Sequence, residues 1–158
     1  MHSQGKTIMQ DIHQLKHTIK GILDSQKLSV LATQGDERPY GSLVAFASTA
    51  DLKTILFATT RATRKYANLL THADVAIVID TRTNQTADFS DAAAVTVLGE
   101  VEEVTAHERK KFLKIYLEKH PYLREFVESP TTAFLRVRVK TYIIVSRFQN
   151  VQELHVSE

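Results

Sequence analysis

The sequence has no cysteine and no tryptophan among its 158 residues. Without cysteine, the chain forms no disulfide and has neither a zinc–thiolate site nor a catalytic thiol. Its longest apolar runs, such as VAIVI and YIIV, are far shorter than the roughly 20 residues that a membrane helix needs. The amino-terminal residues also lack the apolar core of a secretory signal. We therefore expect a cytoplasmic protein with no membrane partner.

Glycine is scarce, with five residues in the chain, and the common glycine-rich phosphate motifs are absent. Neither G-x-G-x-x-G nor G-x-x-x-x-G-K-[ST] occurs, which argues against a Rossmann dinucleotide site and a P-loop. The formal net charge is only +2, whereas nucleic-acid-binding domains usually carry a strongly basic face. We expect no nucleic-acid partner.

Hydrophobic periodicity divides the chain into one helix, a set of strands and a helical insertion. Apolar residues recur at helical spacing from Ile8 to Leu23, and Thr7 is a candidate N-cap, which predicts a helix over about residues 7–25. Short apolar or alternating runs bounded by turn residues predict six or seven strands. They occupy about residues 28–104 and 132–149, with a helical insertion at about 105–128.

Most of the predicted connections between strands are hairpins. This pattern favours a mainly β fold, an antiparallel barrel of six or seven strands with peripheral helices, over a doubly wound parallel sheet. The length of the chain fits one domain over residues 1–158. Gly99 interrupts a long strand and is a candidate bulge.

The stretch TTRATRK at residues 59–65 is basic, contains no acid and follows the apolar run TILFA. Thr63 is a candidate N-cap of the next helix, whose first backbone N–H groups and dipole would favour an anion. Arg64 and Lys65 add fixed positive charge, and the threonines add hydroxyl donors, a combination that suits a phosphate. The alternative is that Arg61, Arg64 and Lys65 are solvated charges of a surface helix, although cations there oppose the helix dipole.

The histidines have simpler explanations than catalysis or metal binding. His13 and His17 stand four residues apart on the polar side of the first predicted helix, without a third ligand nearby, so we expect them to face solvent. His72 and His120 are each at the predicted end of a helix, where an imidazole interacts well with the dipole. We assign no metal site.

Three other charged patterns are expected to be structural. Thr105 and Glu108 have the spacing of a capping box at the start of the insertion. The acids in GEVEEV (100, 102 and 103) alternate with valine, which predicts an exposed strand edge. The basic residues in FLRVRVK (136, 138 and 140) alternate in the same way, which predicts a solvent-facing strand surface or a secondary anion-binding surface.

The ordered segments LSVLATQGDERPYGSLVAFAS and LFATTRATRKYANLLTHADVAIVID resemble the FMN-binding split-barrel family, typified by pyridoxamine 5'-phosphate oxidase. The resemblance is clearest over residues 28–80 and extends more loosely to the last predicted strand. It implies a split barrel of the FMN-binding type and a homodimer with each flavin at the subunit interface. It further implies an oxidoreductase that acts on a small-molecule substrate.

The resemblance also implies roles for particular residues. Arg64 and Lys65 would hold the FMN phosphate, and the backbone from Ser42 to Ala45 would run along the isoalloxazine ring. Arg82 and Asn84 would touch the flavin, across the interface. The full expected cofactor site is Ser42, Leu43, Val44, Ala45, Ala58, Thr59, Thr60, Thr63, Arg64, Lys65, Arg82 and Asn84.

The sequence departs from the oxidase on the side of its substrate. Ala94 stands where the oxidase has a glutamine, and the chain has neither its tryptophan nor its carboxyl-terminal arginine–histidine stretch. The resemblance therefore implies a relative with a different, unassigned substrate, and it assigns no catalytic residue. A non-enzymatic flavin- or nucleotide-binding protein, and a split barrel that uses deazaflavin or haem, are the alternatives.

Overall fold

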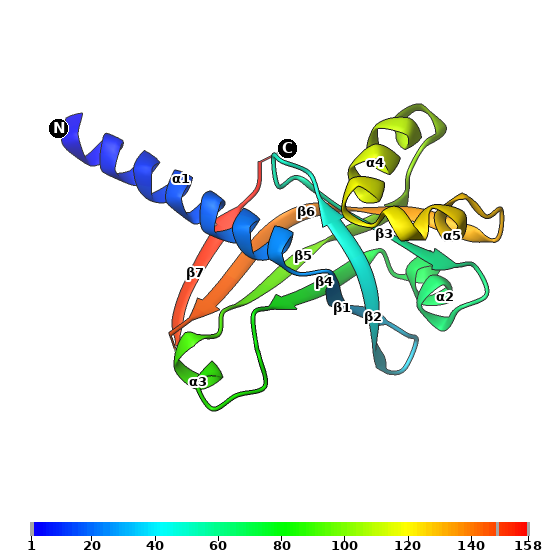
Figure 1. Ribbon diagram of the computed structural model, residues 1–158, viewed down its shortest axis with the longest axis horizontal. Coiled ribbons are helices and arrows are strands. Elements are labelled where there is room, and N and C mark those ends of the chain that lie inside the picture. Colours follow the sequence, from blue (N-terminus) through cyan, green and yellow to red (C-terminus); the bar gives the residue numbers. More distant parts are fainter. Residues whose placement is uncertain (1, 148, 158) are drawn as a thin grey trace.

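Seven antiparallel strands in the described residues form one sheet, most of which closes into a barrel (Figure 1). The computed structural model describes residues 2–147 and 149–157. The strands are β1 (Leu28–Gln34), β2 (Pro39–Ser48), β3 (Thr54–Thr60), β4 (Asp74–Asp80), β5 (Ala94–Glu103), β6 (Thr132–Ser146) and β7 (Asn150–His155). Their order is β3-β2-β1-β4-β5-β6-β7, and β3 also pairs with β6, which closes six strands into a barrel. This confirms the predicted mainly β, antiparallel fold.

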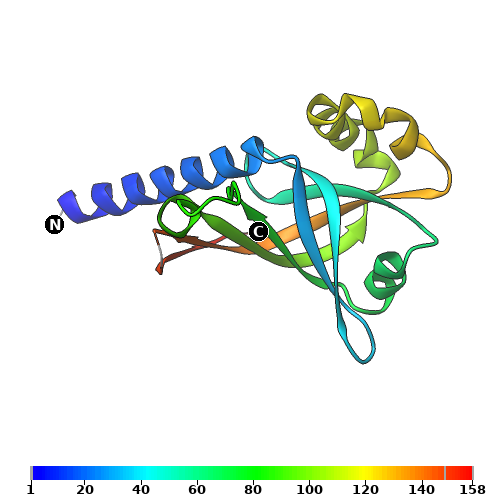
Figure 2. The same ribbon diagram turned by 60° about the horizontal axis from the view of Figure 1, so that its bottom comes forward.

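Peripheral helices accompany the barrel as expected. They are α1 (His2–Ser25), α2 (Arg64–Thr71), α3 (Asp88–Asp91), α4 (Ala106–Lys119) and α5 (Arg124–Glu128), with a 3₁₀ turn η1 (Pro121–Leu123) before α5. Helix α1 crosses one end of the sheet and its amino-terminal half extends beyond it (Figures 1 and 2). It begins at His2, so the predicted N-cap at Thr7 is wrong. No proline interrupts residues 2–7, so nothing in the backbone stops the helix from continuing upstream of Thr7.

One strand, β7, lies beyond the carboxyl-terminal end that the sequence predicted for the barrel. Strand β7 pairs with the second half of β6, from Thr141↔His155 to Ser146↔Asn150. Only Leu154 of β7 is buried, so the strand has little of the apolar alternation that identifies one in a sequence. The predicted boundary at about residue 149 therefore missed it; Phe148, in that predicted strand, lies outside the described residues.

Two apolar clusters stabilise this architecture. The first fills the barrel with inward-facing residues such as Phe46, Phe57 and Ile77, and α1 adds Ile19 and Leu23. The second lies on the outer surface of β2, β3 and β6, where α4 and α5 cover it; its buried members are Ala47, Leu56, Ala58, Phe112, Tyr116, Leu117, Val127 and Phe134.

The long strand β5 carries the predicted bulge. Its register against β6 shifts between Leu98 and Gly99. A Cβ on Gly99 would lie 2.3 Å from the backbone oxygen of Arg138, a distance that no side chain tolerates. Glycine is therefore required here by the close approach of the neighbouring strand.

The acids of β5 and the bases of β6 are not the free surfaces that the sequence suggested. Among the described strands, β5 lies between β4 and β6, but its pairing with β4 stops at Glu100, so only residues 101–103 of β5 lie at an open edge. Lys140 Nζ lies 2.8 Å from Glu100 Oε1, and Arg138 Nε lies 2.7 Å from Glu102 Oε1. Arg136 is 7% exposed, so the prediction of a solvent-facing residue there is wrong. Cross-strand pairing of opposite charges explains the alternation.

The predicted capping box at the start of α4 is also wrong. Thr105 occupies the N-cap position but makes no side-chain cap hydrogen bond. The Glu108 carboxylate instead accepts hydrogen bonds from the Arg136 guanidinium, 3.0 and 3.2 Å from Nη1. A buried cation needs a counter-charge more than an exposed helix end needs a cap, so the ion pair prevails.

The barrel splits between β2 and β3. These strands pair only over three residues, from Phe46↔Phe57 to Ser48↔Ile55. Beyond Phe46, β2 pairs with β1 alone over residues 39–45, while β3 continues along β6 to Thr60. The strands therefore diverge from a fork at Phe46 and Phe57, and the opening between them leads to the start of α2.

Candidate functional site

The start of α2 is built by a chain of threonine hydroxyls. Thr63 is the N-cap, as predicted, and its Oγ1 accepts a hydrogen bond from Tyr66 N at 3.2 Å. The same hydroxyl donates to Thr60 O at 2.9 Å and lies 3.1 Å from Thr59 Oγ1. Thr59 and Thr60 end β3, so these bonds attach the helix start directly to the barrel. The first turn of α2 thus has a rigid backbone beside the split.

The three cations of TTRATRK have different environments. Arg61 is held by the Glu103 carboxylate and the Tyr66 hydroxyl, so it is not free to meet a ligand. Arg64 lies over the Tyr40 ring, 5.6 Å from its centroid. Lys65 is half-buried, and this burial lowers its pKa. Within the described part of the chain, neither Arg64 nor Lys65 forms a salt bridge. Two cations of the three are therefore available to an anion.

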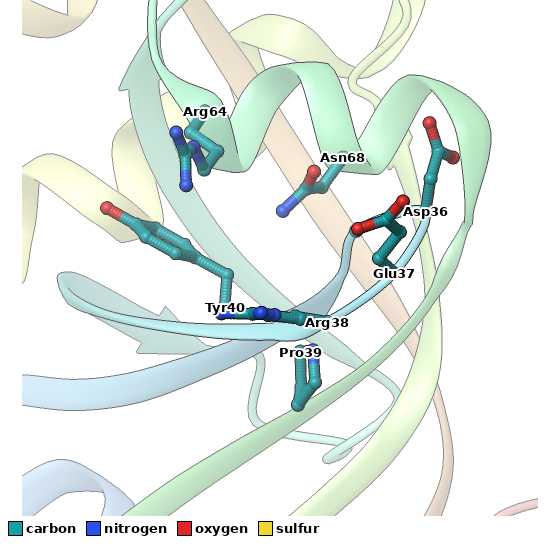
Figure 3. Close-up of a pocket in the computed structure, with 8 residues that line it drawn as sticks. Asp36, Glu37, Arg38, Pro39, Tyr40, Arg64 and Asn68 are labelled. Atoms are coloured by element: carbon teal, nitrogen blue, oxygen red, sulfur yellow. The ribbon is translucent and has the colours of Figure 1, made fainter.

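A pocket of about 360 Å³ lies between α2 and the hairpin that joins β1 to β2. Figure 3 shows Arg64 and Asn68 projecting from α2 towards Tyr40, with Asp36 and Glu37 on the hairpin nearby. Asn68 Nδ2 donates to Thr33 Oγ1 at 3.1 Å, which fastens the helix to β1. The remaining lining residues are Gly35, Arg38 and Pro39.

The predicted ring-contacting segment, residues 42–45, lies on the part of β2 that has left β3. Ser42 and Val44 face the barrel interior, opposite Leu31 and Ser29 of β1, while Leu43 points outwards and is 66% exposed. The Ser42 hydroxyl is buried and has no hydrogen-bond partner among the residues that the structure describes. A buried polar atom without a partner is rare in folded proteins and indicates a missing group, such as a ligand or water.

Arg82 and Asn84 lie far from α2 within one chain. Strand β4 has α2 at its start and their loop at its end (Figure 1). Its seven residues span about 20 Å at the usual rise of a strand. Arg82 Nε lies 3.2 Å from Asp80 Oδ1. The structure therefore groups ten of the twelve predicted residues around the split and leaves these two at the other end of the sheet.

The loop that carries Arg82 and Asn84 is more ordered than the irregular loop that the sequence indicated. The Asp88 carboxylate accepts hydrogen bonds from the backbone N–H of Thr83, Asn84 and Gln85, at 2.7–3.3 Å, and from the Thr83 hydroxyl. These bonds, above all that from the Thr83 backbone, lower the pKa of Asp88. Asn84 adopts φ 62°, the left-handed region that asparagine tolerates well.

Arg82 belongs to a second pocket, of about 610 Å³, beside this loop. Its walls combine the start of β5 with the β6–β7 hairpin and are mostly apolar. They include Ala94 and the exposed side chains Phe89, Val145 and Val151. Ala94, which the resemblance aligns with the glutamine of the oxidase, therefore lies at this pocket, apart from the α2 site.

The histidines fit their predicted places, but one has a further role. His13 and His17 are exposed, and the described residues contain no cluster of side chains able to hold a metal. His72 and His120 are the C-cap residues of α2 and α4. His120 is also completely buried, and its Nε2 lies 2.8 Å from the Phe46 carbonyl oxygen. Its long-range partner, 74 residues away in the chain, left no signal in the sequence.

Comparison with known proteins agrees with the fold and the split. The family model described as pyridoxamine 5'-phosphate oxidase matches residues 15–146, and the chain belongs to this family. No curated protein sequence matches the chain significantly.

Several solved structures share the fold. A heme binding protein from Mycobacterium smegmatis superposes with a TM-score of 0.76 at 17% identity, covering 85% of this chain and 55% of that protein. Campylobacter jejuni ChuZ gives 0.76 at 11%, covering 90% and 60%. A Clostridium acetobutylicum protein of the pyridoxinephosphate oxidase family, related to general stress protein 26, gives 0.69 at 14%, covering 90% and 95%. The chain thus spans little more than half of the first two. At these identities, the similarity establishes the fold alone.

Among the described residues, no helix is both long enough and apolar enough to cross a membrane.

Proposed function

We propose that this protein binds FMN in the split of its barrel and is an FMN-dependent oxidoreductase. One observation carries the proposal: two cations without salt-bridge partners, Arg64 and Lys65, begin a helix that opens onto the split. The family supports a flavin as the ligand, because it is named for a flavin-dependent oxidase. FMN offers both a phosphate dianion and a planar ring with hydrogen-bonding edges, so it matches the two halves of the site.

The phosphate half consists of α2 and the end of β3. Capping by Thr63 leaves the first N–H groups of α2 for an external acceptor, and the helix dipole adds partial positive charge there. Arg64 contributes a planar guanidinium and Lys65 a compact charge, while Thr59 and Thr60 add hydroxyls. Helix start, cations and hydroxyls together form an anion site that needs no glycine-rich loop.

The ring half consists of the free edge of β2 and its neighbourhood. Among the described strands, none pairs with residues 42–45 on the β3 side, so the backbone groups there, apart from the Ala45 carbonyl that Tyr116 bonds, can bond a ligand edge. The unpartnered hydroxyl of Ser42 supplies another bond. Ala58, on β3 beyond the fork, packs its side chain into the outer cluster under α4, so only its backbone is offered to the ring.

We further propose that the protein is a homodimer whose partner completes each flavin site. The outer face of the sheet carries an apolar patch: register places Val30 opposite Leu43 and Val78, and Ala76 opposite Leu98. Leu43 and Leu98 are exposed in the single chain. A two-fold axis over this face would bring the Arg82 loop of one chain to the α2 region of the other. This arrangement accounts for Arg82 and Asn84, which one chain alone leaves distant from the other ten residues.

When bound, FMN supplies the electron-transfer chemistry, and the protein supplies binding, orientation and exclusion of water. Arg64 and Lys65 anchor the phosphate, and β2 fixes the ring against the barrel. Ala94 and the apolar pocket around it replace the polar groups that the oxidase uses, which supports a small-molecule substrate other than pyridoxamine phosphate. The proposal assigns no acid–base residue.

A fluorescence titration with FMN tests the phosphate site. We expect FMN fluorescence to be quenched on binding, and the double substitution Arg64→Ala/Lys65→Ala to weaken FMN binding by about 100-fold, because two charge-assisted interactions are lost. Riboflavin, which lacks the phosphate, provides the ligand control, since its affinity should not respond to the double substitution.

Arg61→Ala is the matched protein control, because Arg61 is already held by Glu103 and Tyr66. It should leave FMN affinity almost unchanged. Equal FMN affinity for the double variant and the wild type would disprove the phosphate assignment, and a large loss in Arg61→Ala would show that the whole basic stretch acts together.

The same protein preparation decides among the alternatives. The M. smegmatis protein of the same fold is named for haem binding, so haem is titrated in parallel and followed by its Soret absorption. If the protein bound haem or deazaflavin but not FMN, that ligand would take the place of FMN as the proposed cofactor. Bound FMN that neither NAD(P)H nor other donors reduce would favour the non-enzymatic alternative.

A further inference from the structure

The carboxyl-terminal end of α4 contacts β2 at the fork where the barrel splits. The Tyr116 hydroxyl donates a hydrogen bond to the backbone oxygen of Ala45 at 3.3 Å. His120 Nε2 lies 2.8 Å from the backbone oxygen of Phe46, which is the first β2 residue paired with β3. Two side chains of one helix end therefore bond two consecutive carbonyls, one on each side of the fork.

Both side chains are enclosed and hold each other in place. Tyr116 is 1% exposed and His120 is fully buried, and their ring centroids are 5.1 Å apart. Tyr116 also meets the Phe134 ring edge-on, at 5.5 Å between centroids. Packing on several sides restricts their rotamers, so the hydroxyl and the imidazole have fixed positions relative to β2.

The imidazole is arranged as a donor to β2. Because a carbonyl oxygen only accepts, Nε2 carries the proton and Nδ1 is the bare nitrogen of the neutral ring. Nδ1 is buried without a hydrogen-bond partner. Burial lowers the pKa of His120, with the positive charge of Lys119 contributing, so the ring stays neutral near pH 7.

A third contact at the same helix end joins α1 to this point. Lys119 Nζ lies 3.9 Å from the centroid of the Phe46 ring and donates to the backbone oxygen of Leu23 at 2.9 Å. Phe46 is thus held through both its carbonyl and its ring. The fork is fixed by α4 and α1 as well as by strand pairing.

We propose that Tyr116 and His120 are positioning residues for the flavin, which set the direction in which β2 leaves the fork. This inference rests on the proposed FMN site. Ala45 is the last residue of the segment proposed to contact the ring, and Ser42 is three residues further along the same strand. A change in the fork therefore moves the whole ring-contacting edge relative to Arg64 and Lys65. Because FMN spans both halves of the site, their spacing affects how well it binds.

Tyr116→Phe tests the hydroxyl with little disturbance, since the ring and its packing remain. We expect faster amide hydrogen exchange at residues 42–46 of the flavin-free protein, FMN binding weakened about five- to tenfold, and a changed visible circular dichroism spectrum of bound FMN. Tyr122→Phe is the matched control, because Tyr122 is 67% exposed and its ring also contacts His120. It should change none of the three measurements.

His120→Gln and His120→Leu form a second pair. Gln retains an N–H that can reach the Phe46 carbonyl, whereas Leu fills the space without a donor. We expect His120→Gln to bind FMN within about twofold of the wild type and His120→Leu to lose about tenfold. If FMN affinity is kept in His120→Gln and lost in His120→Leu, the hydrogen bond to β2 is needed, and a side chain that only fills the core is not sufficient.

The outcomes distinguish this inference from the proposed function. Suppose that the wild type binds FMN and that Tyr116→Phe has the same affinity, spectrum and hydrogen exchange as the wild type. This result would overturn the positioning role and leave the FMN site intact. Equal losses in His120→Gln and His120→Leu would overturn the role of the His120 bond. Wild-type protein that binds no FMN would overturn both proposals, even if exchange at the fork still increased in Tyr116→Phe.

Discussion

At the scale of single residues, neighbours in the sequence can have very different environments. Arg61 and Arg64 are three positions apart in TTRATRK, yet Arg61 is held by Glu103, 42 residues away, and Arg64 is stacked on Tyr40. The basic composition of the stretch indicated an anion site, and it did not separate the two arginines. That separation depends on β5 bringing Glu103 beside the start of α2.

His120 gives a prediction about pH at the same scale. Its pKa in the folded protein lies below the ordinary value of 6.5, because burial disfavours the imidazolium. Below pH 6.5 the unfolded chain binds a proton that the folded protein does not, so the free energy of unfolding should fall as pH falls through this range. The slope approaches about 1.4 kcal/mol per pH unit for one such group. Above pH 7 both states are neutral here, and this contribution is constant.

Urea unfolding from pH 5 to pH 8 measures this effect. The other histidines also titrate in this range, so the informative quantity is the difference between the wild type and His120→Gln. Burial raises the pKa of Tyr116, so this ring stays neutral throughout the range. Burial also lowers the pKa of Lys119 to about 8, so its deprotonation affects only the upper end of the range. We expect the wild type to lose more stability than the variant as pH falls. Parallel curves would contradict the assignment to His120.

At the scale of elements, α4 illustrates a competition that the sequence could not decide. Glu108 had the spacing to cap its own helix, but Arg136 of β6 is 9% exposed in its side chain and needs a counter-charge. The resulting ion pair joins the insertion to the barrel. A helix that seemed self-contained in the sequence is thus fastened by a residue 28 positions later.

Removing the partner of a buried charge is costly, which gives a stability prediction for α4. We expect Glu108→Ala to lower the free energy of unfolding by about 3 kcal/mol, the lower part of the range for buried pairs, since the Glu108 side chain is 31% exposed. Glu118→Ala, on the exposed side of the same helix, is the control and should change little. Urea denaturation measures both. A loss below about 0.5 kcal/mol in Glu108→Ala would mean that water or Glu102 replaces the lost partner.

At the scale of the whole molecule, the proposed dimer would complete the proposed flavin site. The outer face of β1, β4 and β5 and of the first half of β2 carries apolar residues that no described helix covers. The Arg82 loop lies at the other end of β4 from α2. A two-fold dimer would cover the apolar outer face and bring the Arg82 loop of one chain to α2 of the other. Both features thus support the same assembly.

Leu43→Asp tests this assembly. Leu43 is 66% exposed on the outer face of β2, so the substitution should not harm the single chain, but it would bury a charge in the dimer. We expect the wild type to elute as a dimer in size-exclusion chromatography with light scattering, and Leu43→Asp to be monomeric and to bind FMN at least tenfold more weakly. Tyr122→Asp, 67% exposed in η1, is the control and should remain dimeric. A monomeric wild type that binds FMN tightly would refute the dimer.

The sequence by itself determined the fold class, the antiparallel strands, the Gly99 bulge, the N-cap at Thr63 and the family. These features depend on short-range patterns: alternation, helical spacing, turn residues and capping are encoded within a few positions of one another. The basic stretch at the start of α2 is such a feature too, because neighbouring residues specify both the charges and the helix start.

The tertiary structure alone decided which of those local features are free to act. It paired Arg61 with Glu103, buried Arg136 against Glu108, placed His120 on the Phe46 carbonyl and separated Arg82 from α2. Each of these outcomes joins residues dozens of positions apart, and it depends on which strands become neighbours when the barrel closes. Burial then determines the charge, partner and access of each side chain, and no local pattern specifies burial completely.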